Sequence, residues 1–209
     1  MVRQRVRIRF CKLGNLRLIG HRDLMRCFER LFRRGGLPLA MSCGFHPKPR
    51  MTFPLALAVG IEGTDEVMEL ELCEPCTAEE VLSRLTPHVP PGLALGTVEV
   101  LPEGAGKARV RSVCYQVPVP PPFCDGLPEK IDRLRAGPSR LIQRADGRPP
   151  IDLVPLLEEL TLRDGLLFIR LRIGEHRSAR PRDVLSALGL GDLELQGVHF
   201  RRTAVELKS

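Results

Sequence analysis

The segment Gly44–Arg50 brings an aromatic ring, an imidazole and two cations together in the stretch Gly-Phe-His-Pro-Lys-Pro-Arg. Proline fixes φ, so the alternating prolines favour a stiff, extended path. His46, Lys48 and Arg50 would project from it with little conformational freedom left to lose on binding. Phe45 could stack on a base or pack onto the protein core. A rigid cationic loop of this kind suits phosphates and unstacked bases, and the structural alternative is a turn with a solvated charged rim.

A second group of cations precedes this loop. Over residues 21–34 apolar side chains recur at helical spacing, and arginines occupy the opposite face of the predicted helix. Residues 1–50 carry 13 lysines and arginines against two acidic residues, whereas the whole chain has a net charge of only +7, so residues 51–209 are net acidic. Such a local concentration of positive charge is typical of a surface that binds a polyanion. The residues predicted to contact RNA are Arg22, Arg26, Arg30, Arg33, Phe45, His46, Lys48 and Arg50.

Two histidines accompany these cations. His21 opens the predicted helix and His46 lies in the proline-rich loop. Attack by a 2′-hydroxyl on RNA needs proton transfer and stabilisation of an oxyanion, so the pair could serve metal-independent cleavage. Capping or packing of the helix explains His21 equally well. A non-catalytic chain is the first expectation, and His21 and His46 are the candidate catalytic residues if it is a nuclease.

The cysteines predict no metal site. Their number, seven, is odd, and Cys73-Glu-Pro-Cys76 has CxxC spacing without a second pair or nearby histidines to complete a zinc site. The chain also lacks a CxxxCxxC triad, which would hold an iron–sulfur cluster, and the glycine-rich stretches that cradle phosphates or dinucleotides. We therefore expect reduced thiols and no cofactor.

The elements that must position these residues repeat along the chain. Strands at 5–10, 37–41, 66–73 and 94–101 and helices at 21–34 and 78–85 follow a β-α-β-β-α-β order, and residues 51–59 are expected to be extended. A related pattern returns about 102 residues later, with a hairpin turn at 163–165 and a last strand at 197–200. We predict an α+β fold of tandem ferredoxin-like units, 1–101 with the basic face and 107–209 as a scaffold.

The sequence shows no signal for export or membrane insertion. No apolar run approaches the roughly 18 residues that a membrane-spanning helix needs. The first ten residues alternate charged and apolar side chains, as in a strand and unlike a signal peptide. We expect a cytoplasmic protein with no membrane partner.

Four runs of the first unit are similar to a known family: Lys-Leu-Gly-Asn-Leu-Arg at 12–17, Gly-His-Arg-Asp-Leu-Met-Arg at 20–26, the run from Glu29 to Leu39 and the run from Ser42 to Arg50. Through them, residues 3–75 resemble the radical-SAM-linked family, long catalogued as a domain of unknown function. The matched positions are His21, Asp23, Arg26, Gly44, Phe45, Pro47, Pro49 and Arg50.

Members of that family occur alone or fused behind a radical SAM module, often encoded near ribonuclease G and ribosomal proteins. The resemblance implies a separately encoded radical SAM protein as partner and a role in RNA maturation or modification. Many relatives carry Asn-Pro-His-Pro where this chain has His46-Pro-Lys-Pro49. The histidine thus occupies a different position, which favours a binding role over a fixed catalytic one.

Three functions remain open from the sequence. The first is a non-catalytic RNA-binding adaptor that presents RNA to a radical SAM enzyme. The second is a metal-independent endoribonuclease, since tandem ferredoxin-like units with a basic face also resemble the endoribonucleases of CRISPR systems. The third is a protein-interaction module whose basic face docks an acidic partner.

Overall fold

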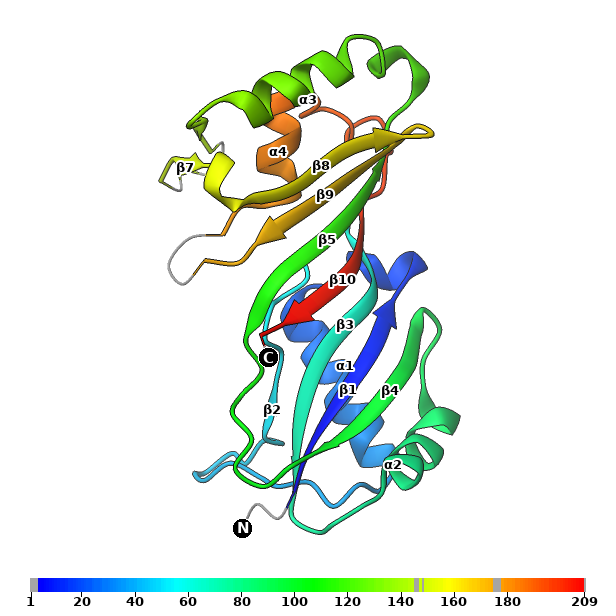
Figure 1. Cartoon of the computed structure of the whole chain (residues 1–209). Coiled ribbons are helices and arrows are strands. Elements are labelled where there is room, and N and C mark those ends of the chain that lie inside the picture. Colours follow the sequence, from blue (N-terminus) through cyan, green and yellow to red (C-terminus); the bar gives the residue numbers. More distant parts are fainter. Residues whose placement is uncertain (1–3, 145–146, 148, 175–177, 209) are drawn as a thin grey trace. The chain divides into compact units, whose positions relative to one another are not determined.

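The chain forms two compact units, Met1–Arg109 and Val110–Ser209, in a computed structural model that describes residues 4–144, 147, 149–174 and 178–208. Helices and mostly antiparallel strands alternate in both units (Figure 1), which confirms the predicted α+β class. The division falls close to the predicted boundary between units 1–101 and 107–209.

The first unit is built on an antiparallel sheet in the order β4-β1-β3-β2. Its elements follow one another as β-α-β-β-α-β, the order of a ferredoxin-like unit. They are β1 (Gln4–Lys12), η1 (Gly14–Leu18), α1 (His21–Arg34), β2 (Met51–Thr52), β3 (Glu62–Leu72), α2 (Ala78–Leu85), η2 (Thr86–His88) and β4 (Leu93–Leu101).

The second unit has a main antiparallel sheet in the order β10-β5-β9-β8 and a separate β6-β7 pair. Its elements are β5 (Val110–Pro118), η3 (Pro121–Phe123), α3 (Leu127–Ala136), β6 (Leu141–Ile142), β7 (Ile151–Asp152), η4 (Val154–Leu156), β8 (Leu157–Arg163), β9 (Leu166–Arg172), α4 (Pro181–Leu188) and β10 (Arg201–Leu207). The predicted hairpin is confirmed: Asp164 and Gly165 turn between β8 and β9 with φ of 49° and 71°. The tandem ferredoxin-like repeat stays a prediction.

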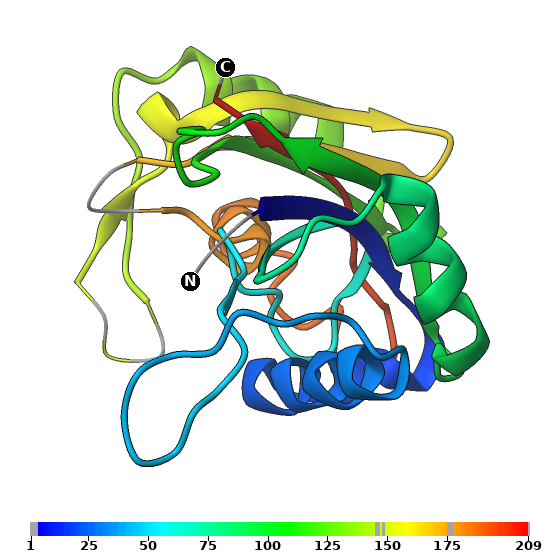
Figure 2. The same cartoon turned by 90° about the horizontal axis from the view of Figure 1, so that it is seen from below.

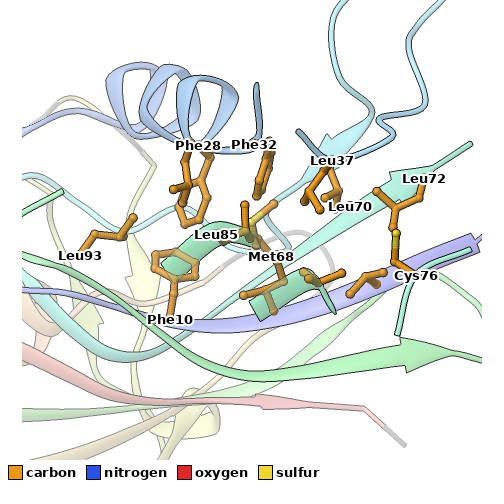
Figure 3. Close-up of a cluster of buried hydrophobic side chains, with 14 of the residues drawn as sticks. Phe10, Phe28, Phe32, Leu37, Met68, Leu70, Leu72, Cys76, Leu85 and Leu93 are labelled. Carbon is orange, nitrogen blue, oxygen red and sulfur yellow. The ribbon is translucent and has the colours of Figure 1, made fainter. Parts of the chain in front are cut away.

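In the first unit, α1 and α2 pack on one face of the sheet, and the hydrophobic core lies between the helices and the strands. Phe28 and Phe32 of α1 point toward Phe10 of β1 and Met68 of β3 (Figure 3), and the rings of Phe10 and Phe28 meet edge to face with centroids 4.9 Å apart. Such pairs contribute about 0.5–1.5 kcal/mol beyond the apolar area they bury. The packing fixes which face of α1 is left for solvent.

Local signals explain both helices of this unit. The predicted bounds of α1 are confirmed, and Gly36, with φ of 60°, ends the helix in a conformation that glycine adopts without strain. The helix α2 starts with a capping box, in which the Thr77 hydroxyl accepts from the Glu80 amide and the Glu80 carboxylate accepts from the Thr77 amide.

Two predicted strands and one predicted extended segment were wrong in extent. Residues 37–41 make only isolated bridges, and β2 stops at Thr52 rather than running to residue 59. Pro38 and Pro54 cannot donate to a ladder, which explains the short pairing at both places. The last strand, β10, covers 201–207 instead of 197–200, because Gly197, with φ of 83°, belongs to the turn that precedes it.

Candidate functional site

The arginines of β1 are neutralised within the first unit. Because Val6 and Ile8 face the core, the alternation of a strand places Arg5, Arg7 and Arg9 on the other face of the sheet. There the Nη2 atoms of Arg5 and Arg7 lie 2.6 and 3.0 Å from the carboxylate of Glu69. Two further carboxylates complete the set: Arg7 pairs with Glu99 at 3.2 Å and Arg9 with Asp65 at 2.6 Å.

Lys12 is also withdrawn from the basic surface. Its side chain is fully buried, and its ammonium donates to the carbonyl oxygens of Ile19 at 2.9 Å and Arg17 at 3.4 Å. Four cations of β1, its three paired arginines and Lys12, therefore hold the unit together instead of facing a ligand. The charge available for binding is concentrated on α1 and in the loop that follows it.

The solvent face of α1 carries a stripe of arginines, which we call the α1 stripe. Its members are all exposed: Arg22, Arg26, Arg30, Arg33 and Arg34. Within the described residues only Arg26 has a carboxylate within 4.0 Å, that of Asp23 at 3.3 Å, and both of those side chains are more than half exposed. An exposed pair of this kind is worth little, so the stripe keeps nearly its full charge.

Residues 40–50 form a hairpin whose backbone is well tied down. The Ser42 amide donates to the Lys48 carbonyl at 2.8 Å, and the Lys48 amide donates to the Ser42 hydroxyl at 3.0 Å. At the base, the amides of Ala40 and Glu71 donate to the carbonyls of Glu71 and Arg50, both at 2.9 Å, so that both arms of the hairpin bond to β3. The stiff loop expected from its prolines is thus anchored at its base.

The tip of the 40–50 hairpin presents an aromatic ring to solvent. Phe45 has a relative exposure of 102%, so its whole side chain is accessible, and His46 and Lys48 beside it are exposed as well. Gly44 has φ of 122°, a conformation that side-chain-bearing residues rarely adopt. The alternative in which Phe45 packs onto the core does not occur.

The predicted contact residues fall into two neighbouring groups. Figure 2 shows α1 and the 40–50 hairpin on the same side of the first unit's sheet. Arg50 lies at the base of the hairpin, where its guanidinium is 3.3 Å from the Glu71 carboxylate and its charge is partly offset. Arg34 was not among the predicted contacts, although its place in the helical series already put it beside Arg30.

The two candidate catalytic histidines have different environments. His21 is half-buried, with its ring edge to face against Phe53 at 5.3 Å, and its Nδ1 has no hydrogen-bond partner. Burial lowers the pKa of His21, and the nearby charge of Lys12 lowers it further. His46 lies at the exposed hairpin tip, and no hydrogen bond or ring contact among the described residues joins it to His21. The role of His21 and His46 as an acid/base pair stays a prediction.

The thiols show no metal centre. All seven cysteines are free, and no group of three or more histidine, cysteine, aspartate or glutamate side chains in the described ranges could hold a metal ion. Burial is the main cause that raises the pKa of the Cys76 thiol, so this cysteine is a poor ligand and nucleophile. Among the described residues there is also no helix of the length and apolar character needed to cross a membrane.

Fold and surface together define a class: a two-unit α+β protein with an arginine stripe and an exposed aromatic hairpin on its first unit. The chain belongs to a family described as uncharacterised proteins conserved in bacteria (DUF2344), whose profile matches residues 5–181. No curated protein matches the chain. A crystal structure of an unknown protein from Galdieria sulphuraria aligns over 99% of both chains with 15% identity and a TM-score of 0.27.

Proposed function

We propose that the chain is a non-catalytic RNA-binding adaptor that presents RNA to a separately encoded radical SAM enzyme in RNA maturation or modification. The observation that carries the proposal is the complete exposure of Phe45 at the tip of an anchored hairpin. Exposing a phenylalanine ring to water is unfavourable, and here the ring lies beside exposed cations on a hairpin whose base is bonded to β3. An aromatic ring held out beside cations is the arrangement on which unstacked bases bind.

The α1 stripe supplies the second requirement of RNA binding. Its arginines, four of them without a carboxylate within 4.0 Å among the described residues, can each contact a phosphate. Arginine is also suited to this role by its planar fork of donors. In this proposal Arg22, Arg26, Arg30, Arg33, Lys48 and Arg50 contact phosphates, while Phe45 stacks on a base and His46 lies beside it.

The radical SAM partner is proposed from the resemblance of residues 3–75 to the radical-SAM-linked family. The absence of a CxxxCxxC triad from the sequence fits a division of labour, in which the cluster chemistry belongs to another chain. The adaptor would then contribute substrate binding and leave the reaction to its partner.

The test is binding of the purified chain to total tRNA and to rRNA fragments by fluorescence anisotropy at several salt concentrations. The variant Arg22→Gln/Arg26→Gln/Arg30→Gln/Arg33→Gln removes four charges from the α1 stripe. A matched control, Lys107→Gln/Arg135→Gln/Arg163→Gln/Lys208→Gln, removes four charges from exposed positions elsewhere. Electrophoresis of the recovered RNA in EDTA reports any cleavage.

We expect tight, salt-dependent binding that is lost in the stripe variant and largely kept in the control. Equal loss in both would mean that net charge alone attracts RNA, and absence of binding would refute the RNA-binding proposal. In that case an acidic protein partner would become the leading occupant of the stripe. Cleavage that survives EDTA and disappears in His46→Ala would instead establish the nuclease.

A further inference from the structure

The second unit contains a basic pocket of about 270 Å³ that lies between its helices. Lys130 and Arg133 come from one face of α3, and Ser139 and Arg140 come from the segment that leads to β6. Ala187 of α4 forms part of the wall. The sequence analysis predicted a scaffold role for this unit and placed no site residue in it.

The three cations of the pocket are available to a ligand. Lys130, Arg133 and Arg140 are exposed, and no carboxylate in the described part of the chain lies within 4.0 Å of their charged nitrogens. Among the residues that the structure describes, no acidic side chain lines the pocket. The helical spacing of α3 carries Asp132 to a different side of the helix from Lys130 and Arg133. The result is a concave surface of uncompensated positive charge, which raises the local concentration of anions.

Arg140 is held in place by the backbone around it. Its amide donates to Oδ1 of Asp152 at 2.8 Å, and its carbonyl accepts from the Leu153 amide at 3.0 Å. The hydroxyl of Ser139 donates to Oδ2 of Asp152 at 2.8 Å. These hydrogen bonds, that of the Arg140 amide most of all and then that of Ser139, lower the pKa of Asp152. Both carboxylate oxygens of Asp152 are thus engaged by the segment that carries Arg140. One wall of the pocket is therefore fixed before a ligand arrives.

Structural contacts account for Lys130 and for one nitrogen of Arg133, whose Nε donates to the Glu129 carbonyl at 3.3 Å. The ammonium of Lys130 lies near Gly189, which ends α4, since a Cβ built at that glycine would be 3.9 Å from Nζ. A cation at a helix C-terminus interacts favourably with the helix dipole, which is reason enough for a lysine there. This interaction gives no reason for Arg133 and Arg140 to converge on the same hollow.

We propose that this pocket binds a phosphate or diphosphate group. Pockets that enclose a drug-sized ligand are roughly 300–1,000 Å³. A volume of about 270 Å³ therefore suits the charged end of a ligand better than a whole cofactor. Two guanidinium groups and an ammonium provide the charge-assisted donors that phosphate oxygens accept. The phosphate is supplied by a small phosphorylated molecule or by an RNA strand, and the two sources have the same chemistry at the pocket.

The test measures the affinity of the chain for inorganic pyrophosphate by isothermal titration calorimetry. Lys130→Gln/Arg140→Gln removes two of the cations, and Arg135→Gln is the control because Arg135 is exposed on the same helix but does not line the pocket. We expect the double variant to bind at least about tenfold more weakly, since two charge-assisted contacts are lost, and the control to bind like the wild type. Arg133→Gln/Arg140→Gln serves as a second variant that keeps Lys130 at the end of α4.

An RNA arm identifies the source of the phosphate. If pyrophosphate competes with RNA and the double variant weakens RNA binding, the pocket receives a phosphate of the RNA strand. If pyrophosphate binds and RNA affinity is unchanged, the ligand is a small phosphorylated molecule. Failure of pyrophosphate to bind, or equal binding by wild type and both variants, overturns the proposal whatever the α1 stripe does, because all residues of the stripe are intact in these variants.

Discussion

Arg5 donates a 2.6 Å hydrogen bond to Oε2 of Glu69, a carboxylate whose side chain is only 4% exposed. The same carboxylate accepts from a second arginine, Arg7, and from the amide of Ala108. One buried acid thus neutralises two cations of β1 that in the sequence belong to the most basic stretch of the chain.

The first prediction concerns this acid. Replacing Glu69 by alanine leaves two guanidinium groups, each about one-fifth exposed, without their shared partner. We expect Glu69→Ala to lower the free energy of unfolding by roughly 2–4 kcal/mol, near the range for breaking a buried pair but reduced by the partial exposure of the arginines. Urea denaturation gives the value. Glu99→Ala is the control, because its side chain is 59% exposed, and it should cost less than about 1 kcal/mol. Equal effects of the two changes would contradict the assignment.

The second prediction concerns the salt dependence of RNA binding. Each phosphate contact on a single strand contributes about 0.7 to the slope of log affinity against log salt. Arg22→Gln/Arg30→Gln removes two members of the α1 stripe, so we expect the slope to fall by about 1.4 relative to the wild type. Titrations of a single-stranded RNA at four or more salt concentrations measure it. An unchanged slope with weaker binding would show that these arginines do not contact phosphates.

The third prediction concerns the hairpin tip. Stacking of a base on an aromatic ring is worth about 1–3 kcal/mol, so Phe45→Ala should weaken RNA binding by roughly 5- to 150-fold. The free energy of unfolding should hardly change, because the ring is fully exposed and packs on nothing. Phe45→Tyr keeps a ring at this position and should keep most of the affinity. Loss of affinity in both variants would point to a contact other than stacking.

The fourth prediction follows from the environment of His21. Burial and the charge of Lys12 lower the pKa of His21 in the folded chain, so the unfolded chain binds a proton more readily. Stability is then greatest above the ordinary histidine pKa of about 6.5 and falls as the pH drops through that value toward the lower folded pKa. We expect the wild type to lose more stability than His21→Gln between pH 7.5 and 5.5. Parallel urea curves at these pH values compare the two, and identical losses would exclude His21 as the cause.

Helix α1 could be predicted from the sequence because its signals are local. Leu24, Phe28 and Leu31 recur at helical spacing, and the glycine pair at 35–36 marks the end. The same holds for α2, whose Thr77 and Glu80 are three residues apart and cap it reciprocally. These features depend on neighbours within one or two turns, which a sequence displays directly.

The charge of β1 could not be assigned in this way because its partners are distant along the chain. The acids that pair with Arg5, Arg7 and Arg9 are 56 to 92 positions away, and only the antiparallel register with β3 and β4 brings them together. The pocket of the second unit is similarly non-local, since Arg140 joins Lys130 through the folding of the intervening chain against Asp152. Counting cations along the sequence therefore overestimates the free positive charge of the first unit and misses the basic pocket of the second.

Because Lys12 is buried, its reactivity toward an amine-reactive reagent reports whether the chain is folded. Of its five lysines, Lys48, Lys107, Lys130 and Lys208 are exposed, whereas the amine of Lys12 is enclosed by backbone carbonyls. An amine-reactive reagent should modify the four exposed positions in the folded protein and reach Lys12 only on unfolding. Since Lys48 lies on the hairpin and Lys130 in the basic pocket, mass-spectrometric footprinting of the unaltered protein can follow each surface separately, with Lys12 as the internal measure of an intact fold.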